Sequence, residues 1–404
     1  MSSATAAPNG QSPLHGLRVL DATAMIAGPL AAQILADYGA DVIKIEPVGG
    51  DLMRRGGAAA RSPDMGALYL QINRNKRSLA LDLRRPQGRD LFLRLAERAD
   101  VVVENFRPGA MDRFGLGYRD VRARRPDVVY VSISGYGQWG PDAERMGYDP
   151  LAQAASGFLS LNGHPDCEPV KAPTFLADDL AGVHAALAAL AALRHRDRCG
   201  EGQHVDVSLL DAMLFQSTGY LTLGAVGDPL PRMGNEFRIA APARVYRARD
   251  GSVMCGIVLD GQWRRLAELV GRPELAADPR YATTVARIAR RAEVDRILAD
   301  WIEPRGVAEA VAELLAAGLP ASPVRSYAEA AADPHVRERE MLQFVPQSGT
   351  GAPAPITGPA AKLSRTPTRV RSGAPALGAH SREILRDLGL SDDDVAGLRS
   401  EGII

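Results

Sequence analysis

The sequence predicts an α/β fold in which helices cover both faces of a parallel sheet. Short apolar segments typical of strands alternate with longer segments typical of helices. Two of the strand segments, VVVE at 101–104 and VVYVSIS at 128–134, are continuous apolar runs, as expected for strands buried on both faces. The 404 residues are 46% hydrophobic and 24% charged, which is ordinary globular composition with room for two or three domains.

The expected elements follow this alternation in order. Apolar runs predict the strands, and helical periodicity or small-residue content predicts the helices. The first three elements form a βαβ unit, with a strand at 17–21, a helix at 28–38 and a strand at 40–45. They are followed by a strand at 78–83, a helix at 86–98, the strand at 101–104, a helix at 118–125, the strand at 128–134 and a long helix from 178. Ligands of such sheets bind beyond the carboxyl ends of the strands.

The pattern changes after the long helix, which predicts a second domain. A loop rich in Gly and Pro at 227–239 precedes two short strands, at 243–246 and 252–257, and helices at 262–270, 287–302 and 307–317. We therefore divide the chain into a disordered tail at 1–15, a large α/β domain at 16–227, a small α+β domain at 228–325, and a segment at 326–404 that contains a long extended connection near 345–368 and a terminal helix at 381–388.

Charge and cysteine content narrow the class of partner. The net charge is zero and the basic residues are spread along the chain, so we expect no nucleic-acid or membrane partner but a small molecule or another subunit. Three cysteines at wide spacing indicate neither a disulfide framework nor a zinc site, and a reducing cytoplasm fits them. The N-terminus lacks the features of a signal peptide, and no uninterrupted apolar run approaches the ~18 residues of a membrane span.

A GxGxxG motif at 135–140 follows a predicted strand, but it is a weak indication of a dinucleotide site. Such a motif must open a helix, whereas Pro141 follows it here and no helix start is evident. The first βα turn contains one glycine where three are needed. Motifs for serine hydrolases, P-loop phosphoryl transfer and zinc proteases are also lacking.

Two polar features of the sequence each allow a structural and a functional interpretation. Asp178 and Asp179 stand where the long helix begins, and we expect the helix N-terminus to keep a carboxylate there ionised. One of the two is interpreted either as the helix cap or as a functional carboxylate. The basic residues Arg54, Arg55, Arg74, Lys76 and Arg77 form either a solvated face or an anchor for phosphates. His184, in the alanine-rich helix, is interpreted as a packed or surface side chain.

Together these segments resemble the class III coenzyme A transferases, the family of formyl-CoA transferase and carnitine CoA-transferase. The resemblance rests on GLRVLDATAMIAGPLAAQILADYGADVIKIEP at 16–47, on the segment from NRNKRSLALDL to ENFRPGAMDRFGLGY at 73–118, on the D-x-x-x-G of Asp178 to Gly182, and on GEGQHVDVSLLDAML at 200–214. It covers about residues 16–215 and continues more weakly beyond them.

The resemblance implies a CoA-transferase with Asp178 as its nucleophile and Asp179 as a helix-capping neighbour. The carboxylate would attack an acyl-CoA thioester and form an anhydride, then an aspartyl-CoA thioester. No tightly bound cofactor or metal is expected, and acyl-CoA is a substrate. By the same resemblance, the CoA site comprises Ile26, Ala27, Leu81, Arg84, Asn105, Phe106, Arg107, Arg113, Tyr148 and Asp149.

Two departures from the family pattern bear on the reaction. The racemase branch, typified by α-methylacyl-CoA racemase, has a histidine where this chain has Tyr148, and a tyrosine is a poor base at neutral pH. The glycine-rich closing loop of formyl-CoA transferase is not evident, and Gly234-Asn235 is its nearest counterpart. We therefore expect a short carboxylic or dicarboxylic acid as acceptor, with succinyl-CoA as donor, and keep proton transfer at Cα and a non-catalytic CoA- or NAD-binding module as alternatives.

The resemblance also implies an architecture. A Rossmann-like large domain would be built from both chain ends, with the small domain between them, and two chains would form an interlocked homodimer. The extended connection near 345–368 suits such threading.

Overall fold

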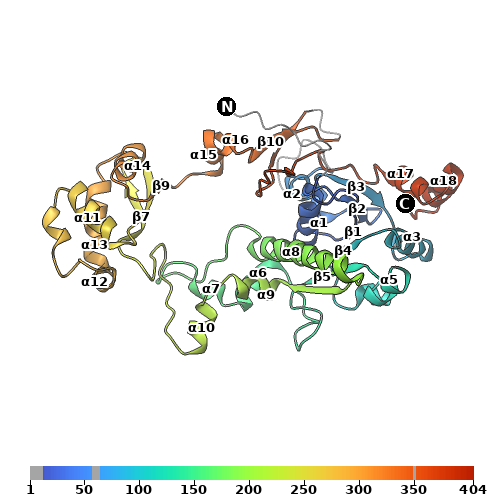
Figure 1. The fold of residues 1–404 in the computed structure, drawn as a ribbon, viewed down its shortest axis with the longest axis horizontal. Coiled ribbons are helices and arrows are strands. Elements are labelled where there is room, and N and C mark those ends of the chain that lie inside the picture. Colours follow the sequence, from blue (N-terminus) through green and yellow to red (C-terminus); the bar gives the residue numbers. More distant parts are fainter. Residues whose placement is uncertain (1–11, 57–63, 349–351) are drawn as a thin grey trace. The chain divides into compact units, whose positions relative to one another are not determined.

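The chain folds into two compact units, described in a computed structural model over residues 12–56, 64–348 and 352–404 (Figure 1). The larger unit comprises the residues up to Phe158, together with Ala172–Thr222 and His335–Ile404; the smaller one comprises Leu159–Lys171 and Leu223–Pro334. The boundaries at 228 and 325 expected from the sequence therefore lie several residues inside the smaller unit, and residues 159–171 join it as well.

A six-stranded parallel sheet forms the centre of the larger unit, which confirms the predicted α/β class. Its strand order is β3-β2-β1-β4-β5-β6. Each neighbouring pair is parallel, so all six carboxyl ends meet at one edge. The strands are β1 (Arg18–Ala22), β2 (Asp41–Glu46), β3 (Lys76–Ala80), β4 (Val101–Glu104), β5 (Val129–Ser134) and β6 (His204–Ser208).

Strand β6 was not predicted, and its position explains why. The segment HVDVS alternates polar and apolar residues, and β6 lies at the edge of the sheet with much of its surface open. An edge strand does not need the continuous apolar sequence that marked the central strands. The other five strands fall within two residues of their predicted positions at their N-terminal ends.

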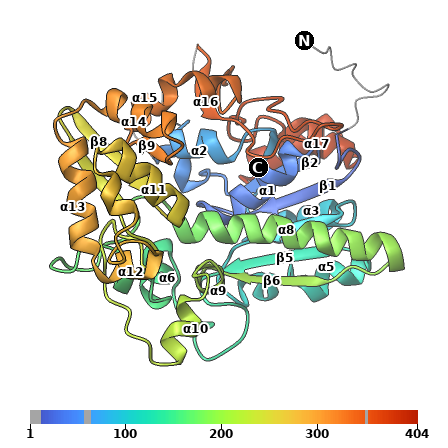
Figure 2. The same ribbon diagram turned by 60° about the vertical axis from the view of Figure 1, so that its left-hand side comes forward.

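Helices cover both faces of this sheet. On one face, α1 (Ala27–Asp37), α8 (Leu176–Cys199) and α9 (Leu209–Phe215) pack on a core of small and β-branched side chains. Figure 2 shows α8 lying along the strands beside α1. The opposite face is covered by α3 (Pro86–Ala96), α5 (Tyr118–Arg124), α17 (Ser381–Asp387) and α18 (Asp392–Ser400).

Helix α8 is also long and apolar enough, by length and composition alone, to cross a membrane. The count of uninterrupted apolar residues in the sequence did not reveal this. However, its Ala181, Ala185 and Ala189 are buried in the core beside α1. We therefore interpret α8 as a core helix of the larger unit.

The segment after the smaller unit is less extended than expected. Strands β10 (Leu342–Val345) and β11 (Ala354–Thr357) pair antiparallel, and β11 packs on Tyr69 and Leu70. The chain then reaches the face of the sheet that α3 and α5 cover, where Asp82 N donates a hydrogen bond to Ile403 O at 2.8 Å. The tail expected at 1–15 lies mostly outside the described residues, but Leu14 packs against the core.

The smaller unit contains a three-stranded antiparallel sheet of β7 (Ala243–Ala248), β8 (Gly251–Gly256) and β9 (Ala321–Pro323). The first two strands were predicted, whereas β9 is too short to leave a pattern. Buried Trp263 lies in its core. Its helices are α11 (Asp260–Leu269), α12 (Thr284–Ala289), α13 (Arg291–Ile302), α14 (Val307–Ala316) and α15 (Tyr327–Ala332).

Short helices complete the fold. They are α2 (Ala67–Ile72), α4 (Ala110–Arg113), α6 (Asp149–Ala155), α7 (Phe158–Leu161), α10 (Tyr220–Ala225) and α16 (Pro334–Glu338), with 3-10 turns η1 (Leu52–Arg55) and η2 (Pro273–Ala276). As expected, no helix begins within the GxGxxG segment at 135–140, because the next helix is α6.

Candidate active site

The turn between β1 and α1 lies at the carboxyl edge of the sheet and is tied to the end of β4. Asn105 accepts a hydrogen bond from Ala24 N at 2.9 Å and donates one to Ala24 O at 2.7 Å. Met25 has a positive φ of 66°, and Ile26 and Ala27 then begin α1 with buried side chains. These two residues can therefore offer a ligand only backbone groups, and the first N–H groups of a helix have no partner within it.

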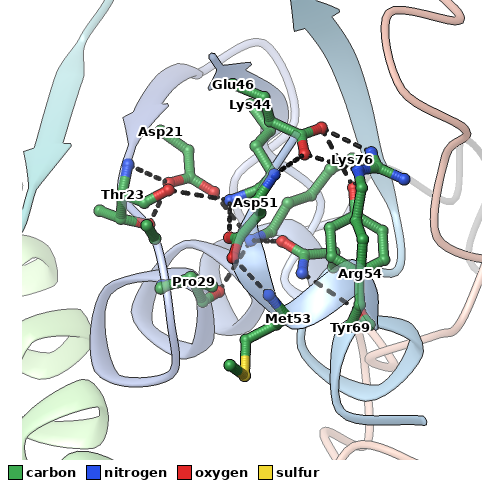
Figure 3. A network of polar contacts seen from close by, with 12 residues as sticks. Asp21, Thr23, Pro29, Lys44, Glu46, Asp51, Met53, Arg54, Tyr69 and Lys76 are labelled. Atoms are coloured by element: carbon green, nitrogen blue, oxygen red, sulfur yellow. Dashed lines mark hydrogen bonds and ion pairs between the residues drawn. The ribbon is translucent and has the colours of Figure 1, made fainter. Parts of the chain in front are cut away.

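A buried cluster of charged side chains forms hydrogen bonds to the backbone of this turn and of the start of α1 (Figure 3). Lys44 Nζ donates to Thr23 O at 2.9 Å and forms an ion pair with Asp51 at 3.2 Å. Lys76 Nζ donates to Asp21 and to Pro29 O, each at 2.8 Å. Both ammonium groups thus bind carbonyl oxygens that flank the start of α1, so the turn is held from two sides.

The basic residues 54–77 belong largely to such buried pairs, which corrects both interpretations drawn from the sequence. Arg54 pairs with Glu46 at 2.6 Å and Arg74 with Asp37 at 2.7 Å, and Lys76 pairs with Asp21. Arg77 pairs with Asp41 at 2.6 Å. Arg54, Arg74 and Lys76 are neither a solvated face nor free to bind phosphates, because their charges are already matched inside the fold.

Asp178 lies in the first turn of α8, not at its cap, so the predicted capping role of Asp178 and Asp179 is wrong. The helix begins at Leu176 with Phe175 at the N-cap position. The carboxylate of Asp149 caps it instead, accepting from Ala177 N at 2.7 Å and more weakly from Asp178 N at 3.4 Å.

The local environment also opposes ionisation of Asp178, contrary to the expectation that the helix N-terminus keeps it charged. Burial raises the pKa of Asp178 to about 7, and the negative charges of Asp149 and Asp179 add to the effect. Burial, followed by the charge of Asp149, also raises the pKa of Asp179. A carboxyl group with this pKa changes its charge near neutral pH.

Gly182 explains the spacing of the D-x-x-x-G motif. It lies four residues after Asp178, on the same face of α8. A Cβ at this position would lie 2.8 Å from Ala27 O and 3.1 Å from the side chain of Leu30. The glycine therefore lets α8 approach the first turn of α1, which places Asp178 one helical turn from that contact.

The other predicted residues divide into groups. Tyr148, 55% exposed, and buried Asp149 lie at the start of α6, and Asp149 contacts the backbone at Asp178. Phe106 and Arg107 follow β4, and Arg113 ends α4. The ring of Phe106 is 36% exposed, so it can meet a ligand.

Among the described residues, the hydrogen bonds and ion pairs of Leu81 and Arg84 go to other partners. Leu81 is buried, and its N–H donates to Glu46 O at 2.7 Å. Arg84 pairs with Asp82 at 2.8 Å. Both follow β3, and β2 separates that strand from β1, so they lie at the same edge of the sheet but away from Asp178.

The sequence did not predict a polar cavity on the face of the sheet opposite α8, although one residue of the predicted CoA site, Arg107, lines it. The cavity has a volume of about 120 Å³, and its lining also includes Glu104, Ser132 and His204. Ser132 Oγ and His204 Nε2 are 2.9 Å apart. Burial raises the pKa of Glu104 to about 7. A carboxylate that ends an otherwise apolar strand, as in VVVE, is the signal that could have indicated it.

His184 shows the packed character expected of it. Its ring makes an edge contact with Phe215, with ring centroids 4.8 Å apart. It therefore has a structural contact and lies outside the groups that surround Asp178.

We expect the substitution Gly182→Ala to force α8 and α1 apart, because the added methyl group would collide with backbone of α1. Overpacking of this kind costs about 1–3 kcal/mol, and CoA binding should weaken with it. Thermal unfolding and calorimetric titration with CoA would measure the two effects. Gly224→Ala on α10 is the matched control, because its nearest neighbour lies 3.9 Å away; equal effects of the two substitutions would contradict the assignment.

We expect Lys76→Met to destabilise the protein by about 3–5 kcal/mol, because it leaves a buried charge without its main partner. Arg124→Met is the control: Arg124 and Glu97 form an exposed pair at 2.6 Å, so its loss should cost at most about 1 kcal/mol. Chemical denaturation would measure both. The double variant Asp21→Asn, Lys76→Met should recover part of the loss; equal costs for Lys76→Met and Arg124→Met would contradict a supporting role for the cluster.

The raised pKa of Asp178 predicts how stability changes with pH. The folded state holds this proton to about pH 7, whereas in the unfolded state the carboxyl group has its ordinary pKa of 3.8 and releases it there. The contribution of Asp178 to stability is therefore fully present below about pH 4 and declines as the pH rises through 7. Relative to the wild type, Asp178→Asn should gain melting temperature across this window. A difference that stays constant from pH 4 to 8 would contradict the shift.

Comparison with known proteins shows the family of this chain. The family model of CoA-transferase family III matches residues 14–381. The succinate–glutarate CoA-transferase of Agrobacterium fabrum is 38% identical, covering 94% of this chain and 97% of the relative. The succinyl-CoA:mesaconate CoA-transferase of Haloarcula hispanica is 39% identical over 93% of this chain and 96% of its own length.

Solved structures show the same fold. A CaiB/BaiF family protein from Brucella suis has a TM-score of 0.83 at 36% identity, over 94% of this chain and all of that one. A protein from Mycobacterium tuberculosis has a TM-score of 0.83 at 32% identity, over 93% of this chain and all of that one. The chain therefore belongs to CoA-transferase family III, and it is an enzyme of the CoA-transferase class.

Proposed function

We propose that this enzyme transfers CoA from succinyl-CoA to a short dicarboxylic acid, with Asp178 as the nucleophile. The observation that carries the proposal is the position of Asp178 in the first turn of α8, one turn before the close contact of Gly182 with α1. The acceptor class is supported by the names of three relatives, which pair succinate or succinyl-CoA with glutarate, mesaconate and D-citramalate. Each of these acceptors is a small dicarboxylate.

The proposed reaction exchanges acyl bonds in four steps. The Asp178 carboxylate attacks the thioester carbonyl of succinyl-CoA, and the C–S bond breaks to give a mixed anhydride and CoA thiolate. The thiolate attacks the aspartyl carbonyl, which releases succinate and leaves an aspartyl-CoA thioester. The acceptor carboxylate then attacks this thioester to form a second anhydride, and CoA thiolate attacks the acceptor acyl carbon and frees Asp178. Because no step changes an oxidation state, the mechanism needs no redox cofactor.

The residues assigned to the site have separate tasks in this scheme. Asp149 orients the first turn of α8 by accepting from Ala177 N, and Gln153 holds Asp149 with a 2.7 Å hydrogen bond from its amide. The first N–H groups of α1 are in place to stabilise negative charge that develops on an attacked carbonyl. Phe106, Arg107 and Arg113 offer an exposed ring and cations for the nucleotide part of CoA.

One observation favours a second candidate, proton transfer at Cα of an acyl-CoA. A general base works best when its pKa lies near the working pH, and the pKa of Asp178 is raised to about 7. A racemase needs a second acid or base, and this chain has Tyr148 where the racemase branch has a histidine. Deuterium incorporation at Cα without an acceptor acid would identify this activity.

The interlocked homodimer and the cytoplasmic location stay predictions of the family resemblance. An apolar surface on the larger unit is consistent with a second chain. Val183 and Leu187 lie four residues apart on α8 and are 52% and 61% exposed, and Phe215 is 76% exposed. A partner chain would remove these side chains from water.

We expect Asp178→Ala and the isosteric Asp178→Asn to abolish CoA transfer while CoA binding persists. Hydroxylamine added to the wild-type enzyme with succinyl-CoA should label Asp178, as peptide mass spectrometry would show. Asp179→Asn is the matched control: it should keep activity, but the acid limb of its pH–rate profile should move to lower pH, because one negative charge that raises the pKa of Asp178 is gone. Transfer by Asp178→Asn at the wild-type rate, or labelling of another residue, would refute the nucleophile.

A further inference from the structure

A cluster of possible metal ligands lies at the end of α8 that is remote from Asp178. His195 and Cys199 are one helical turn apart, and His195 Nε2 lies 3.1 Å from Cys199 Sγ. Glu201, another of the described residues, contributes a carboxylate oxygen. This oxygen, the His195 nitrogen and the Cys199 sulfur all lie within 4.8 Å of one another. Asp178 and Cys199 are 21 residues apart on α8, which corresponds to about 32 Å along a helix.

The turn after α8 brings Glu201 back toward the helix. Gly200 has a φ of 76°, in the left-handed region, and its N–H donates to Arg196 O at 2.7 Å. The next residues are held against the start of β5: a Cβ on Gly202 would lie 2.0 Å from Val128 O, and Tyr130 N donates to Gln203 O at 3.0 Å. The backbone that carries Glu201 is thus fixed from both sides, so the exposed side chains of the three residues start from fixed backbone positions.

The chemistry of this set suits a soft divalent transition metal. One imidazole nitrogen, one thiolate and one carboxylate are the ligands that Zn²⁺ prefers, and a tetrahedral ion would place the nitrogen and sulfur about 3.6 Å apart. The observed 3.1 Å requires only a small opening of the pair. The cation would also lie at a helix C-terminus, where the helix dipole favours positive charge.

The charged side chains near these three residues affect how tightly a metal ion can bind. Arg196 is directed to Asp100, with which it pairs at 2.9 Å. Arg194 and Arg198 are exposed cations of the same helical turn, and their repulsion opposes a bound cation. We therefore expect weaker binding than at a site without these neighbouring cations.

We propose that His195, Cys199 and Glu201 form a binding site for Zn²⁺ or a similar transition-metal ion. The ion would replace the thiol proton of Cys199, and water would complete its coordination. It would link the end of α8 to the connection that enters β6, so its effect would be on stability. The expectation of no zinc site considered only cysteine spacing, and it did not count a histidine and a carboxylate beside one cysteine.

The test uses the reduced, chelator-treated full-length protein titrated with Co²⁺. We expect a thiolate-to-cobalt charge-transfer band that saturates at one ion per chain and disappears when Zn²⁺ is added. Cys199→Ser should abolish the band, and His195→Ala and Glu201→Ala should each weaken binding by about tenfold or more. Binding should also weaken as the pH falls, because protons compete for the thiolate and the imidazole.

Cys167→Ser is the matched control, because Cys167 is the other exposed cysteine among the described residues; its band should match the wild type. A band that persists in Cys199→Ser, unchanged affinity in both His195→Ala and Glu201→Ala, or no band at millimolar Co²⁺ would overturn the proposal. CoA transfer should be the same with and without chelator, since the cluster is far from Asp178. Failure of this site would therefore leave the proposed transfer reaction untouched.

Discussion

The buried charge cluster beneath the β1–α1 turn is the constraint on which the rest of the larger unit depends. Three carboxylates, Asp21, Glu46 and Asp51, face three cations, Lys44, Arg54 and Lys76, and all six side chains are buried. Burial lowers the pKa of Lys76 to about 8 even though Asp21 attracts its proton. Charges taken out of water are stabilising only when each has partners. Because these residues come from β1, β2, β3 and the turn after β2, their pairing joins the three strands beside the start of α1.

Helix α8 depends in turn on this fixed turn. Its glycine packs on the carbonyl of Ala27, and its free N–H groups are occupied by a carboxylate from another helix, Asp149. The favourable field of the helix N-terminus is therefore used by Asp149. Asp178, next to it, is largely buried and lies near negative charges, and both effects raise the pKa of its carboxyl group. The two aspartates near this helix end therefore have different roles: Asp149 accepts hydrogen bonds from the backbone, whereas Asp178 is a carboxyl group with a raised pKa.

Elements could be predicted where a hydrophobic pattern reflects the burial of a strand. Features that depend on partners far away in the sequence could not be predicted. The central strands, such as VVVE at 101–104, are apolar because both faces are covered, so they could be located. Edge strand β6 and the short β9 lack that signal. The basic residues near 54–77 were misread because their partners, such as Asp21 and Asp37, lie far away in the sequence. The capping of α8 by Asp149 could not be foreseen either, since it joins residues 28 positions apart.

The hydrogen bond between Asp82 and Ile403 has a consequence for how the chain acquires its fold. The core on the α3 side of the sheet includes Leu79 and Leu81 together with Ile384, Leu385 and Ile403. These partners are separated by some three hundred residues, and contacts of such long separation slow folding because a large loop must close first. During synthesis, α3 and α5 can cover their part of that face early, but the part that α17 and α18 cover stays open until residues beyond 381 have left the ribosome. Most of the smaller unit is one continuous stretch, Leu223–Pro334, so it can form earlier. The nascent chain thus exposes part of an apolar sheet face for most of its translation, and such exposed surface favours aggregation of folding intermediates.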